Sequence, residues 1–342
     1  MFDDLKKKIN EVSKSKKIKV FYFGNTASTE KNSFYLTTTR ENKNFIYFGA
    51  IVFSEKIAKK IAKIIDGKFN FILTDLEKKV ISLNKIRYVN IDRVVKENIK
   101  KTKIYNYKGN DLTVNACETL VNHIYSNDPK GIGGKKILIL GAGNIGFKLS
   151  LKFTESGANL YIFRRNKTIL KNLSNTINFI KPKATIAKSR TVNSLNINLN
   201  KFDLIIGTTD RKSLINLEHV KKLSKQIKII DIGKGILEKE ALRLLINKSI
   251  ELYRLDVTPA YDGYLENIYR TTEINDSNLK KTRIFKKFNL VKRGILSDDG
   301  TLIVDDVDNP KVLYGISDGR GGFKKISVKK LNNLKNTLKK ND

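Results

Sequence analysis

Hydrophobic residues change their spacing abruptly near the middle of the chain. Residues 136–140 form a short apolar run typical of a buried parallel strand. Ile145, Leu149 and Phe153 follow at intervals of four, which places them on one face of an α-helix. Residues 158–163 begin a second apolar run. The pattern predicts a strand, a helix and a strand in immediate succession.

The same alternation continues downstream of this segment. Strand-like apolar runs recur at residues 183–189, 202–209, 227–233 and 250–256. Amphipathic segments separate the last three runs, and alternating strands and helices predict a parallel sheet with helices on both faces. The six strands together predict a doubly wound α/β domain of the Rossmann type over residues 126–270.

The N-terminal part of the chain, residues 1–125, predicts a second, smaller α/β domain. Apolar runs predict strands at residues 18–25, 44–53, 69–75 and 103–107. Hydrophobic residues at helical spacing predict helices at residues 54–66 and 112–125. Asp111 stands immediately before the second helix, where an aspartate side chain commonly caps free backbone N–H groups.

The C-terminal part, residues 271–342, predicts strands followed by a helix. Residues 290–322 have the pattern of a β-meander, with an Asp-Gly turn at Asp299 and Gly300. Residues 326–340 combine apolar positions at helical spacing with many lysines. This combination predicts a basic amphipathic tail that docks on protein, with a membrane or RNA as the alternative.

Two acidic segments near the C-terminus allow more than one interpretation. Residues 256–266 predict a polar loop after the sixth strand, which either closes over a substrate or forms a dimer contact. Asp305, Asp306 and Asp308 either bind a cation or alternate with apolar residues on exposed strands. No cluster of His and Cys has the spacing of metal ligands, so we predict no metal cofactor.

Composition and charge exclude some classes of protein without selecting a function. The 342 residues include 67 Lys and Arg against 34 Asp and Glu, a formal net charge of +33. The lysines are spread along the whole chain, so we interpret the charge as a compositional bias and expect no specific nucleic-acid partner. The single cysteine, Cys117, suits a reducing compartment. Without an apolar leader or an apolar run of about 18 residues, a cytoplasmic protein with no membrane span is expected.

The junction between the strand at 136–140 and its helix matches the G-x-G-x-x-G pattern. Gly141 permits a tight turn, Gly143 lets the backbone approach a pyrophosphate, and Gly146 lets the helix pack against the strand. Next to these glycines, Asn144 and Ile145 open the helix, whose free N–H groups and positive dipole end attract the pyrophosphate. The pattern predicts dinucleotide binding.

Residues after the other strands complete the predicted cofactor site, because ligands of such sheets bind at the carboxyl ends of the strands. Gly207, Thr208, Thr209 and Asp210 follow the fourth strand, and Gly233 follows the fifth. We predict that these residues lie along the cofactor.

The end of the second strand predicts which dinucleotide is bound. Domains that prefer NAD usually carry an acid here, which bonds the ribose 2′-hydroxyl, whereas arginine accommodates the 2′-phosphate of NADP. The sequence has Arg164 and Arg165 and no acid at this point. Guanidinium groups bind phosphate through paired hydrogen bonds. We therefore predict NADP as the cofactor.

The stretch from residue 141 to 166, GAGNIGFKLSLKFTESGANLYIFRRN, resembles the nucleotide-binding domain of a known group of enzymes. The group contains shikimate dehydrogenase, glutamyl-tRNA reductase and methylenetetrahydrofolate dehydrogenase. Residues 202–233 are also similar to the corresponding stretch of adenosylhomocysteinase. The first resemblance implies that the N-terminal domain holds the substrate and that an Asn/Asp pair precedes the linking helix. Asn110 and Asp111 occupy that place.

The resemblance also implies a catalytic lysine in the first domain, although the proline-containing motif around it is absent here. Lys108 and the Lys78-Lys79 pair are the candidates. A lysine near a carboxylate can donate or accept the proton of a carbonyl or alcohol. We predict Asp111, Lys108 and Asn110 as catalytic residues, with the alternative that Asp111 is only a helix cap.

These observations predict an oxidoreductase that transfers a hydride between NADP(H) and a small anionic carbonyl or alcohol metabolite in an interdomain cleft, and we expect a homodimer. A hydrolase or lyase with permanently bound NAD and a non-catalytic dinucleotide-binding protein are the alternatives. Cys117 lies within an apolar helical pattern, which favours a buried thiol over a nucleophile and disfavours a glutamyl-tRNA reductase. His219 is expected at the surface, and His123 either there or beside the cleft.

Overall fold

The computed structural model of the chain describes residues 1–209, 213–275, 281–285 and 287–339. The chain divides into two compact units, Met1–Asp262 and Gly263–Asp342. The predicted limit at residue 125 follows helix α4 (Gly109–Ile124), inside the first unit. The limit at residue 270 lies inside helix α9 (Thr258–Asn275). The division into three domains stays a prediction.

The N-terminal region of the first unit is a sheet in the order β3-β5-β1-β6-β8, with β4 paired to β5. Its strands are β1 (Ile18–Gly24), β3 (Phe34–Leu36), β4 (Arg40–Glu41), β5 (Phe45–Val52), β6 (Phe71–Asp75) and β8 (Lys103–Tyr107). Strands β1, β5, β6 and β8 are parallel and confirm the four predicted strands, whereas β3 and β4 are antiparallel to β5. A separate pair joins β2 (Ser28–Thr29) to β7 (Val80–Ile81).

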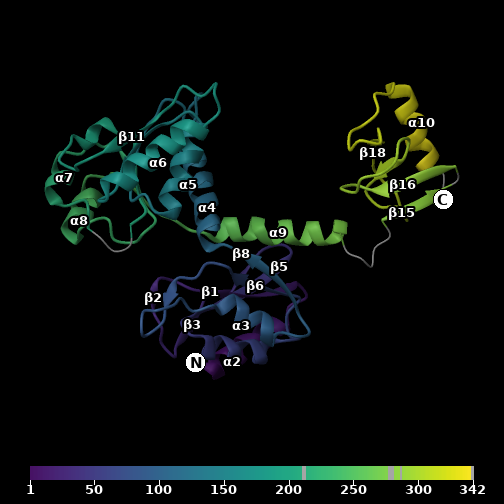
Figure 1. The fold of residues 1–342 in the computed structure, drawn as a ribbon, viewed down its shortest axis with the longest axis horizontal. Coiled ribbons are helices and arrows are strands. Elements are labelled where there is room, and N and C mark those ends of the chain that lie inside the picture. The colour runs from purple at the N-terminus through teal and green to yellow at the C-terminus, as the bar shows by residue number, and fades with distance from the viewer. Residues whose placement is uncertain (210–212, 276–280, 286, 340–342) are drawn as a thin grey trace. The chain divides into compact units, whose positions relative to one another are not determined.

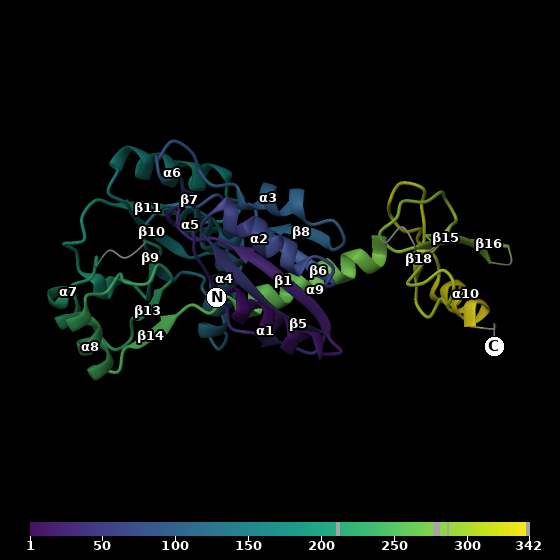
Figure 2. The same cartoon turned by 90° about the horizontal axis from the view of Figure 1, so that it is seen from below.

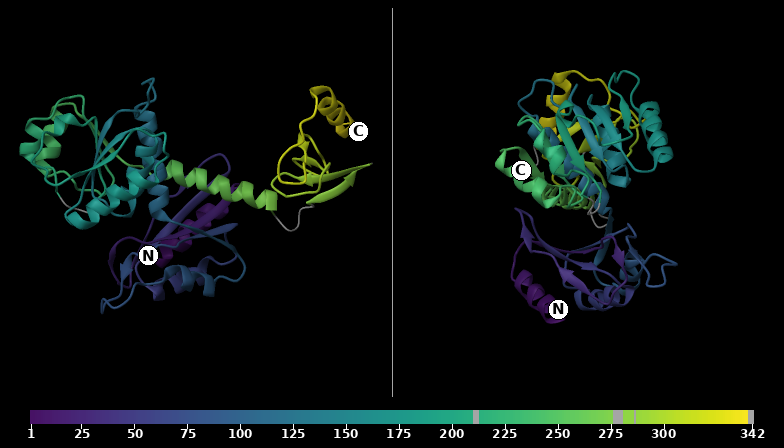
Figure 3. Two further views of the ribbon diagram at one scale, coloured as in Figure 1. Left: turned by 45° about the horizontal axis from the view of Figure 1, so that its top comes forward. Right: turned by 90° about the vertical axis from the view of Figure 1, so that its left-hand side faces the viewer.

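Three helices cover one face of this sheet, namely α1 (Phe2–Ser13), α2 (Glu55–Ile65) and α3 (Ile91–Asn98) (Figures 2 and 3). Alternate residues of a strand point to opposite faces. Phe21, Phe23 and Phe48 accordingly share one buried core with the three helices. Tyr22 points the other way, and its ring lies 5.0 Å from that of Tyr261, near the start of α9.

Helix α4 leads from the N-terminal sheet to the second sheet of the unit. Its N-cap is Lys108, and Asp111 lies inside the first turn, so the prediction that Asp111 caps this helix is wrong. The helix starts earlier than predicted. Gly109 and Asn110 are poor helix formers, and for this reason the sequence pattern placed the start after them. Buried Cys117 packs on the second sheet, which confirms its predicted role as a small apolar side chain.

The second sheet has six parallel strands in the order β11-β10-β9-β12-β13-β14. Its strands are β9 (Lys136–Leu140), β10 (Asn159–Phe163), β11 (Ser189–Val192), β12 (Leu204–Gly207), β13 (Lys228–Asp231) and β14 (Glu251–Arg254). Counted along the chain, the order is 3-2-1-4-5-6, that of a doubly wound Rossmann sheet. The predicted fold class is confirmed.

Helices cover both faces of the Rossmann sheet (Figure 1). The connecting helices are α5 (Asn144–Glu155), α6 (Lys167–Ile180), α7 (Leu217–Lys221) and α8 (Lys239–Asn247). Along β9, Ile137 and Ile139 face α4 and α5. Leu138 and Leu140 share a core with α7 and α8 on the opposite face.

Two predicted elements of this region are wrong. The third strand is Ser189–Val192 rather than 183–189. Ile186, which completed the apolar pattern, is 91% exposed. The loop predicted at 256–266 is mostly helix α9, because the carboxylate of Asp256 accepts hydrogen bonds from the N–H and the hydroxyl of Thr258, where the helix begins.

The second unit begins within α9, and its described residues then form a four-stranded sheet in sequential order and the helix α10 (Figure 3). Its elements are β15 (Thr282–Phe285), β16 (Phe288–Lys292), β17 (Leu302–Val304), β18 (Leu313–Ile316) and α10 (Val328–Lys339). Strands β16 and β17 are parallel, so the predicted meander is wrong at this step. Gly300 has the positive φ of a turn, +84°, but the turn lies in a crossover. The predicted tail helix packs Leu338 into the core of its own unit.

Two of the three acids singled out in this unit, Asp305 and Asp306, stabilise turns, whereas the carboxylate of Asp308 pairs with Arg283 at 3.6 Å. The Asp305 carboxylate accepts hydrogen bonds from the N–H groups of Lys311 and Val312, and Asp306 accepts from Asp308. Within the described ranges, no group of three or more His, Cys, Asp or Glu residues is placed to hold a metal ion. No described helix combines the length and the apolar character needed to cross a membrane.

Candidate functional site

The glycine-rich turn between β9 and α5 has the geometry that its sequence predicts. Gly141 has a φ of +107°, which only glycine adopts readily. A Cβ on Gly146 would lie 1.9 Å from the Gly141 carbonyl oxygen, so the helix approaches the turn too closely for any side chain. A Cβ on Gly143, the N-cap of α5, would meet no described atom within 4 Å. Space for a ligand therefore lies beside the helix N-terminus, where Asn144 and Ile145 form the first turn.

A cavity of about 380 Å³ lies against this turn. It is lined by Gly141, Ala142, Gly143, Phe163, Arg164, Arg165, Asn166, Thr208, Thr209 and Leu214. The wall thus includes residues at the carboxyl ends of β10 and β12, as predicted for a dinucleotide site. Thr209 Oγ1 is buried and has no hydrogen-bond partner among the described residues. A polar ligand atom in the cavity would satisfy it.

Arg164 and Arg165 bring two guanidinium groups to the wall of this cavity. Arg164 is half-buried and donates a hydrogen bond to the carbonyl oxygen of Ala142 in the glycine turn. Arg165 is exposed. No described residue contributes a carboxylate to the cavity wall. The residues present therefore fit an anionic ligand with its phosphate groups at the turn and at the end of β10.

The remaining predicted cofactor residues have different positions. Gly233 lies behind the cavity wall, because its Cβ would be 1.8 Å from the carbonyl oxygen of Thr209. This close contact joins the ends of β12 and β13. The hydroxyl of Thr208 donates to the Gly141 carbonyl oxygen and holds the turn. Asp210 lies outside the described residues.

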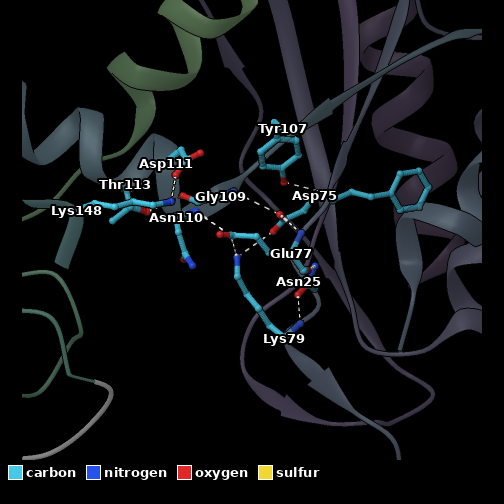
Figure 4. A network of polar contacts seen from close by, with 11 residues as sticks. Asn25, Asp75, Glu77, Lys79, Tyr107, Gly109, Asn110, Asp111, Thr113 and Lys148 are labelled. Atoms are coloured by element: carbon cyan, nitrogen blue, oxygen red, sulfur yellow. Dashed lines mark hydrogen bonds and ion pairs between the residues drawn. The ribbon is translucent and has the colours of Figure 1, made fainter. Parts of the chain in front are cut away.

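A second polar site lies at the carboxyl end of β6 in the N-terminal region (Figure 4). Lys79 Nζ lies 3.0 Å from Asp75 Oδ2 and 2.8 Å from Glu77 Oε2. We call Asp75, Glu77 and Lys79 the acid–lysine cluster. Their side chains are 3%, 17% and 21% exposed. Burial raises the pKa of Asp75 above its ordinary value, although the charge of Lys79 opposes the shift.

Main-chain and amide groups hold the acid–lysine cluster against the first turn of α4. The N–H of Asn110 donates to Glu77 Oε2 at 2.9 Å, and the N–H of Gly109 donates to Asp75 Oδ1 at 3.4 Å. From the end of β1, the Asn25 side chain donates to the carbonyl oxygen of Glu77 at 2.8 Å. The helix start and a largely buried lysine are thereby brought together, as Figure 4 shows.

The structure separates the residues predicted to be catalytic. Asn110 contacts the acid–lysine cluster, whereas Asp111 pairs with Lys148 of α5. Lys108 is exposed and forms no ion pair with any carboxylate in the described chain. Of the Lys78-Lys79 candidates, Lys79 is the residue that reaches the start of α4. The catalytic assignments themselves stay predictions.

Sequence reasoning missed Asp75, Glu77 and Asn25. A signal existed, because Asp75 ends β6 and Asn25 directly follows β1. Polar residues at the carboxyl ends of adjacent parallel strands meet at the edge where ligands bind. Applying that rule to the N-terminal region, as to the Rossmann region, would have found the site.

The thiol and imidazole groups do not form a further site. Burial raises the pKa of the Cys117 thiol to about 12, so it is a poor nucleophile. His123 is exposed on α4. His219 is half-buried, and its Nδ1 accepts the N–H of Asn216 at 3.2 Å, which completes a cap at the start of α7.

Comparison with known families gives one match, over residues 121–262, to the D-isomer specific 2-hydroxyacid dehydrogenase, NAD binding domain. A search of curated proteins gives no match. The matched segment covers α4's end and the whole Rossmann sheet. The match supports a nicotinamide dinucleotide as the cofactor of this Rossmann-type region and an oxidoreductase as the class of protein. The finer resemblance to the shikimate dehydrogenase group stays a prediction.

Three of the solved structures that match the chain have low sequence identity to it. One component of dipicolinate synthase, from Bacillus halodurans, is 12% identical, with 74% of this chain and 97% of that chain covered and a TM-score of 0.38. L-tryptophan dehydrogenase from Nostoc punctiforme is 11% identical, with 75% and 74% covered and a TM-score of 0.42. D-lactate dehydrogenase from Escherichia coli is 13% identical, with 69% and 82% covered and a TM-score of 0.34. Similarity at this level carries no information about the substrate of this chain.

Proposed function

We propose that the chain is an NADP(H)-dependent oxidoreductase that transfers a hydride to or from a small anionic carbonyl or alcohol metabolite. The observation that carries the proposal is the pair Arg164 and Arg165 in the wall of the dinucleotide cavity, without a carboxylate from the described residues. NAD presents a neutral 2′-hydroxyl at this end of the cofactor, whereas NADP presents a phosphate. Two guanidinium groups favour the phosphate.

The residues around the cavity have separate roles in binding the dinucleotide. Gly143 leaves room for the pyrophosphate at the N-terminus of α5, whose N–H groups and dipole favour negative charge. Arg164 uses one donor on Ala142. A guanidinium has five N–H donors, so this contact positions the group and leaves others for the ligand. Thr209 Oγ1 offers a further hydrogen bond.

The acid–lysine cluster supplies the proton-transfer groups in this proposal. The bound nicotinamide supplies or accepts the hydride. Lys79 donates the proton to the carbonyl oxygen of the substrate, or removes it from the alcohol in the reverse direction. Asp75 and Glu77 hold the ammonium group in place through contacts of 3.0 and 2.8 Å. The proposal thus assigns the role predicted for Lys108 to Lys79. Asn110, which was predicted to be catalytic, orients the substrate in this proposal.

Calorimetry with NADP and NAD tests the cofactor assignment. Replacing both Arg164 and Arg165 by Gln should weaken NADP binding at least a hundredfold, about 2.7 kcal/mol, because each charged hydrogen bond contributes about 1.5–3 kcal/mol. NAD affinity should change little. The matched control replaces Arg190 and Arg243 by Gln. These two arginines lie in the Rossmann region outside the cavity, so their replacement removes the same charge.

Four results would contradict the proposal in different ways. Equal binding of NAD and NADP by the unaltered chain, or an equal loss in the Arg190/Arg243 control, would reject the arginine site. A dinucleotide retained through gel filtration and unchanged after turnover would favour a hydrolase or lyase. Reversible binding without turnover of a broad carbonyl and alcohol panel would favour a non-catalytic binding protein.

A further inference from the structure

A second cavity of about 490 Å³ lies at the carboxyl ends of β13 and β14 in the first unit. It is lined by Arg40, Thr113, Ile232, Lys234, Arg254, Leu255, Asp256 and Val257. Strand β4 of the N-terminal sheet, helix α4 and the Rossmann sheet therefore all contribute to its wall. The Rossmann part is the strand edge at which ligands of such sheets bind.

The charges in this wall do not balance. Three cationic side chains, Arg40, Lys234 and Arg254, face one carboxylate, Asp256, which leaves an excess of two positive charges. Within the described ranges none of the three cations forms an ion pair. Hydrogen bonds from Thr258, with the charges of Arg40 and Arg254, hold the pKa of Asp256 below its ordinary value. Its carboxylate is therefore charged at neutral pH and neutralises only one cation.

Backbone geometry fixes the turn that carries one of the three cationic residues. Lys234 has a φ of +61°, a left-handed conformation that is uncommon for a residue with a side chain. The Asp231 carboxylate holds this turn by accepting the N–H groups of Lys234 at 2.9 Å and Gly235 at 2.7 Å. Strained residues of this kind are concentrated at functional sites.

We infer that this cavity binds the anionic part of the substrate, and that this part carries two negative charges, as a phosphate ester or a pair of carboxylates. The inference rests on the proposed function. Thr113 in the wall lies three residues after Asn110, hence on the same face of α4. Ile232 and Lys234 flank Gly233, which contacts Thr209 of the dinucleotide cavity. Through Thr113 and Gly233, the wall of this cavity is thus connected to both polar sites.

The cofactor itself does not account for these cations. The dinucleotide cavity and the second cavity share none of their lining residues. The residues that would bind the phosphate groups of the cofactor, namely Gly143, Arg164 and Arg165, all line the dinucleotide cavity. Changes at Arg40 or Arg254 should therefore affect anion binding and leave dinucleotide binding intact.

Calorimetric titration of small anions into the NADP-saturated chain tests this inference. Malonate and inorganic phosphate represent the two dianions, and acetate is the single-charge control. We expect at least one dianion to bind at least tenfold more tightly than acetate. Arg254→Gln, at an exposed position, should weaken that dianion at least tenfold, and Arg40→Gln should do the same. The matched control, Arg243→Gln on α8, removes one charge outside the cavity and should change affinity less than twofold.

Each outcome separates the possibilities. Stronger binding of malonate identifies a dicarboxylate, and stronger binding of phosphate identifies a phosphate ester. Equal binding of acetate and both dianions, or an equal loss in Arg243→Gln, would overturn the inference. Thermal unfolding followed by circular dichroism checks that Arg40→Gln still folds, since the charge of Arg40 acts on the buried Tyr22 hydroxyl. If no dinucleotide binds, the proposed function fails, and the same titrations on the chain alone still test the anion site.

Discussion

The two polar sites of the first unit differ in the groups that form them: main-chain groups in one and side chains in the other. The dinucleotide cavity depends on main-chain geometry, and the critical glycines lie within six consecutive residues, from Gly141 to Gly146. The acid–lysine cluster depends on side chains held by distant segments. Asn25 and Glu77 are 52 residues apart in the sequence, and Glu77 and Asn110 are 33 apart.

The difference matches a division between cofactor binding at one site and substrate chemistry at the other. A main-chain site binds groups that every dinucleotide has, so the same few glycines serve many chemistries. In the proposed function, the side-chain site supplies the proton and holds the substrate. Changes to the first should therefore act through sterics and folding, and changes to the second through charge and turnover.

The largest expected effect is on turnover at the acid–lysine cluster. Lys79→Met removes the proposed proton donor and should lower turnover by about 10²–10⁴-fold, the usual contribution of general acid–base catalysis. The measurement is NADPH oxidation with the carbonyl substrate that a screen of dianionic carbonyl compounds identifies. NADP affinity should not change.

Two neighbouring lysines serve as controls for this variant. Lys78→Met and Lys108→Met remove the same charge from exposed positions and should leave turnover within about twofold, because solvent screens exposed charges strongly. A loss confined to Lys108→Met would restore the assignment made from the sequence and would remove the cluster from catalysis.

Sequence patterns predict the Rossmann region well because its determinants are local. Strand runs, helix periodicity and the glycine turn each lie within one short segment, and the arginines follow their strand directly. The strand predicted at 183–189 is wrong because its alternating pattern includes Ile186, whose side chain is exposed. Periodicity records where apolar residues recur, and only tertiary contacts decide whether they are buried.

The acid–lysine cluster was less predictable for the same physical reason. Strands β1 and β6 were predicted, but nothing local in the sequence says that they are neighbours in the sheet. Without that pairing, Asn25 and Asp75 are ordinary turn residues. Helix α9 was missed because its polar opening residues favour a loop locally, whereas burial of Tyr261 against the N-terminal sheet stabilises the helix.

The second-largest effect concerns folding at the glycine turn. Gly146→Ala places a Cβ 1.9 Å from the Gly141 carbonyl oxygen and should lower the free energy of unfolding by about 3 kcal/mol or more. Gly143→Ala meets no described atom within 4 Å and should cost less than about 1 kcal/mol. Urea unfolding measures both. Equal losses at the two positions would contradict the close-packed turn.

NADP affinity provides a second test at Gly143. Gly143→Val should keep a cooperative unfolding transition and lose NADP binding, because its branched side chain fills the space beside the helix N-terminus. Calorimetry with NADP checks this. Wild-type affinity in Gly143→Val would mean that the pyrophosphate binds elsewhere.

A smaller effect concerns the pH dependence of stability. The pKa of Asp75 is raised in the folded chain, so the folded state binds a proton more readily than the unfolded state, whose aspartates have pKa values of about 3.9. Stability contributed at Asp75 is therefore lost as pH rises from about 4 through the folded pKa. The unfolding free energy of the unaltered chain, relative to Asp75→Asn, should fall across this window in urea titrations.

Asp66 provides a control of opposite sign. Burial alone would raise its pKa, but hydrogen bonds from the N–H groups of Lys100, Lys101 and Thr102 outweigh burial and hold the pKa below the ordinary value. Its stabilising contribution is present above the unfolded pKa and is lost as pH falls through the folded pKa. Relative to Asp66→Asn, the unaltered chain should gain stability as pH rises. The same slope for both variants would contradict the assigned shifts.

The smallest expected effect decides what Asp111 does. A capping aspartate would contribute about 1 kcal/mol whatever stands at position 148. The structure instead pairs Asp111 with Lys148, at exposures of 43% and 34%, where an ion pair contributes about 0–1 kcal/mol and weakens with salt. A double-mutant cycle of Asp111→Ala and Lys148→Met in urea should therefore give a coupling of about 0.2–1 kcal/mol.

Glu118 and Lys152 join the same two helices at similar exposure and form the matched cycle. Equal couplings with unchanged turnover would leave Asp111 as a helix–helix contact. A fall in turnover for Asp111→Ala but not for Glu118→Ala would support the catalytic role predicted from the sequence, and a loss that is independent of Lys148 would contradict the ion pair.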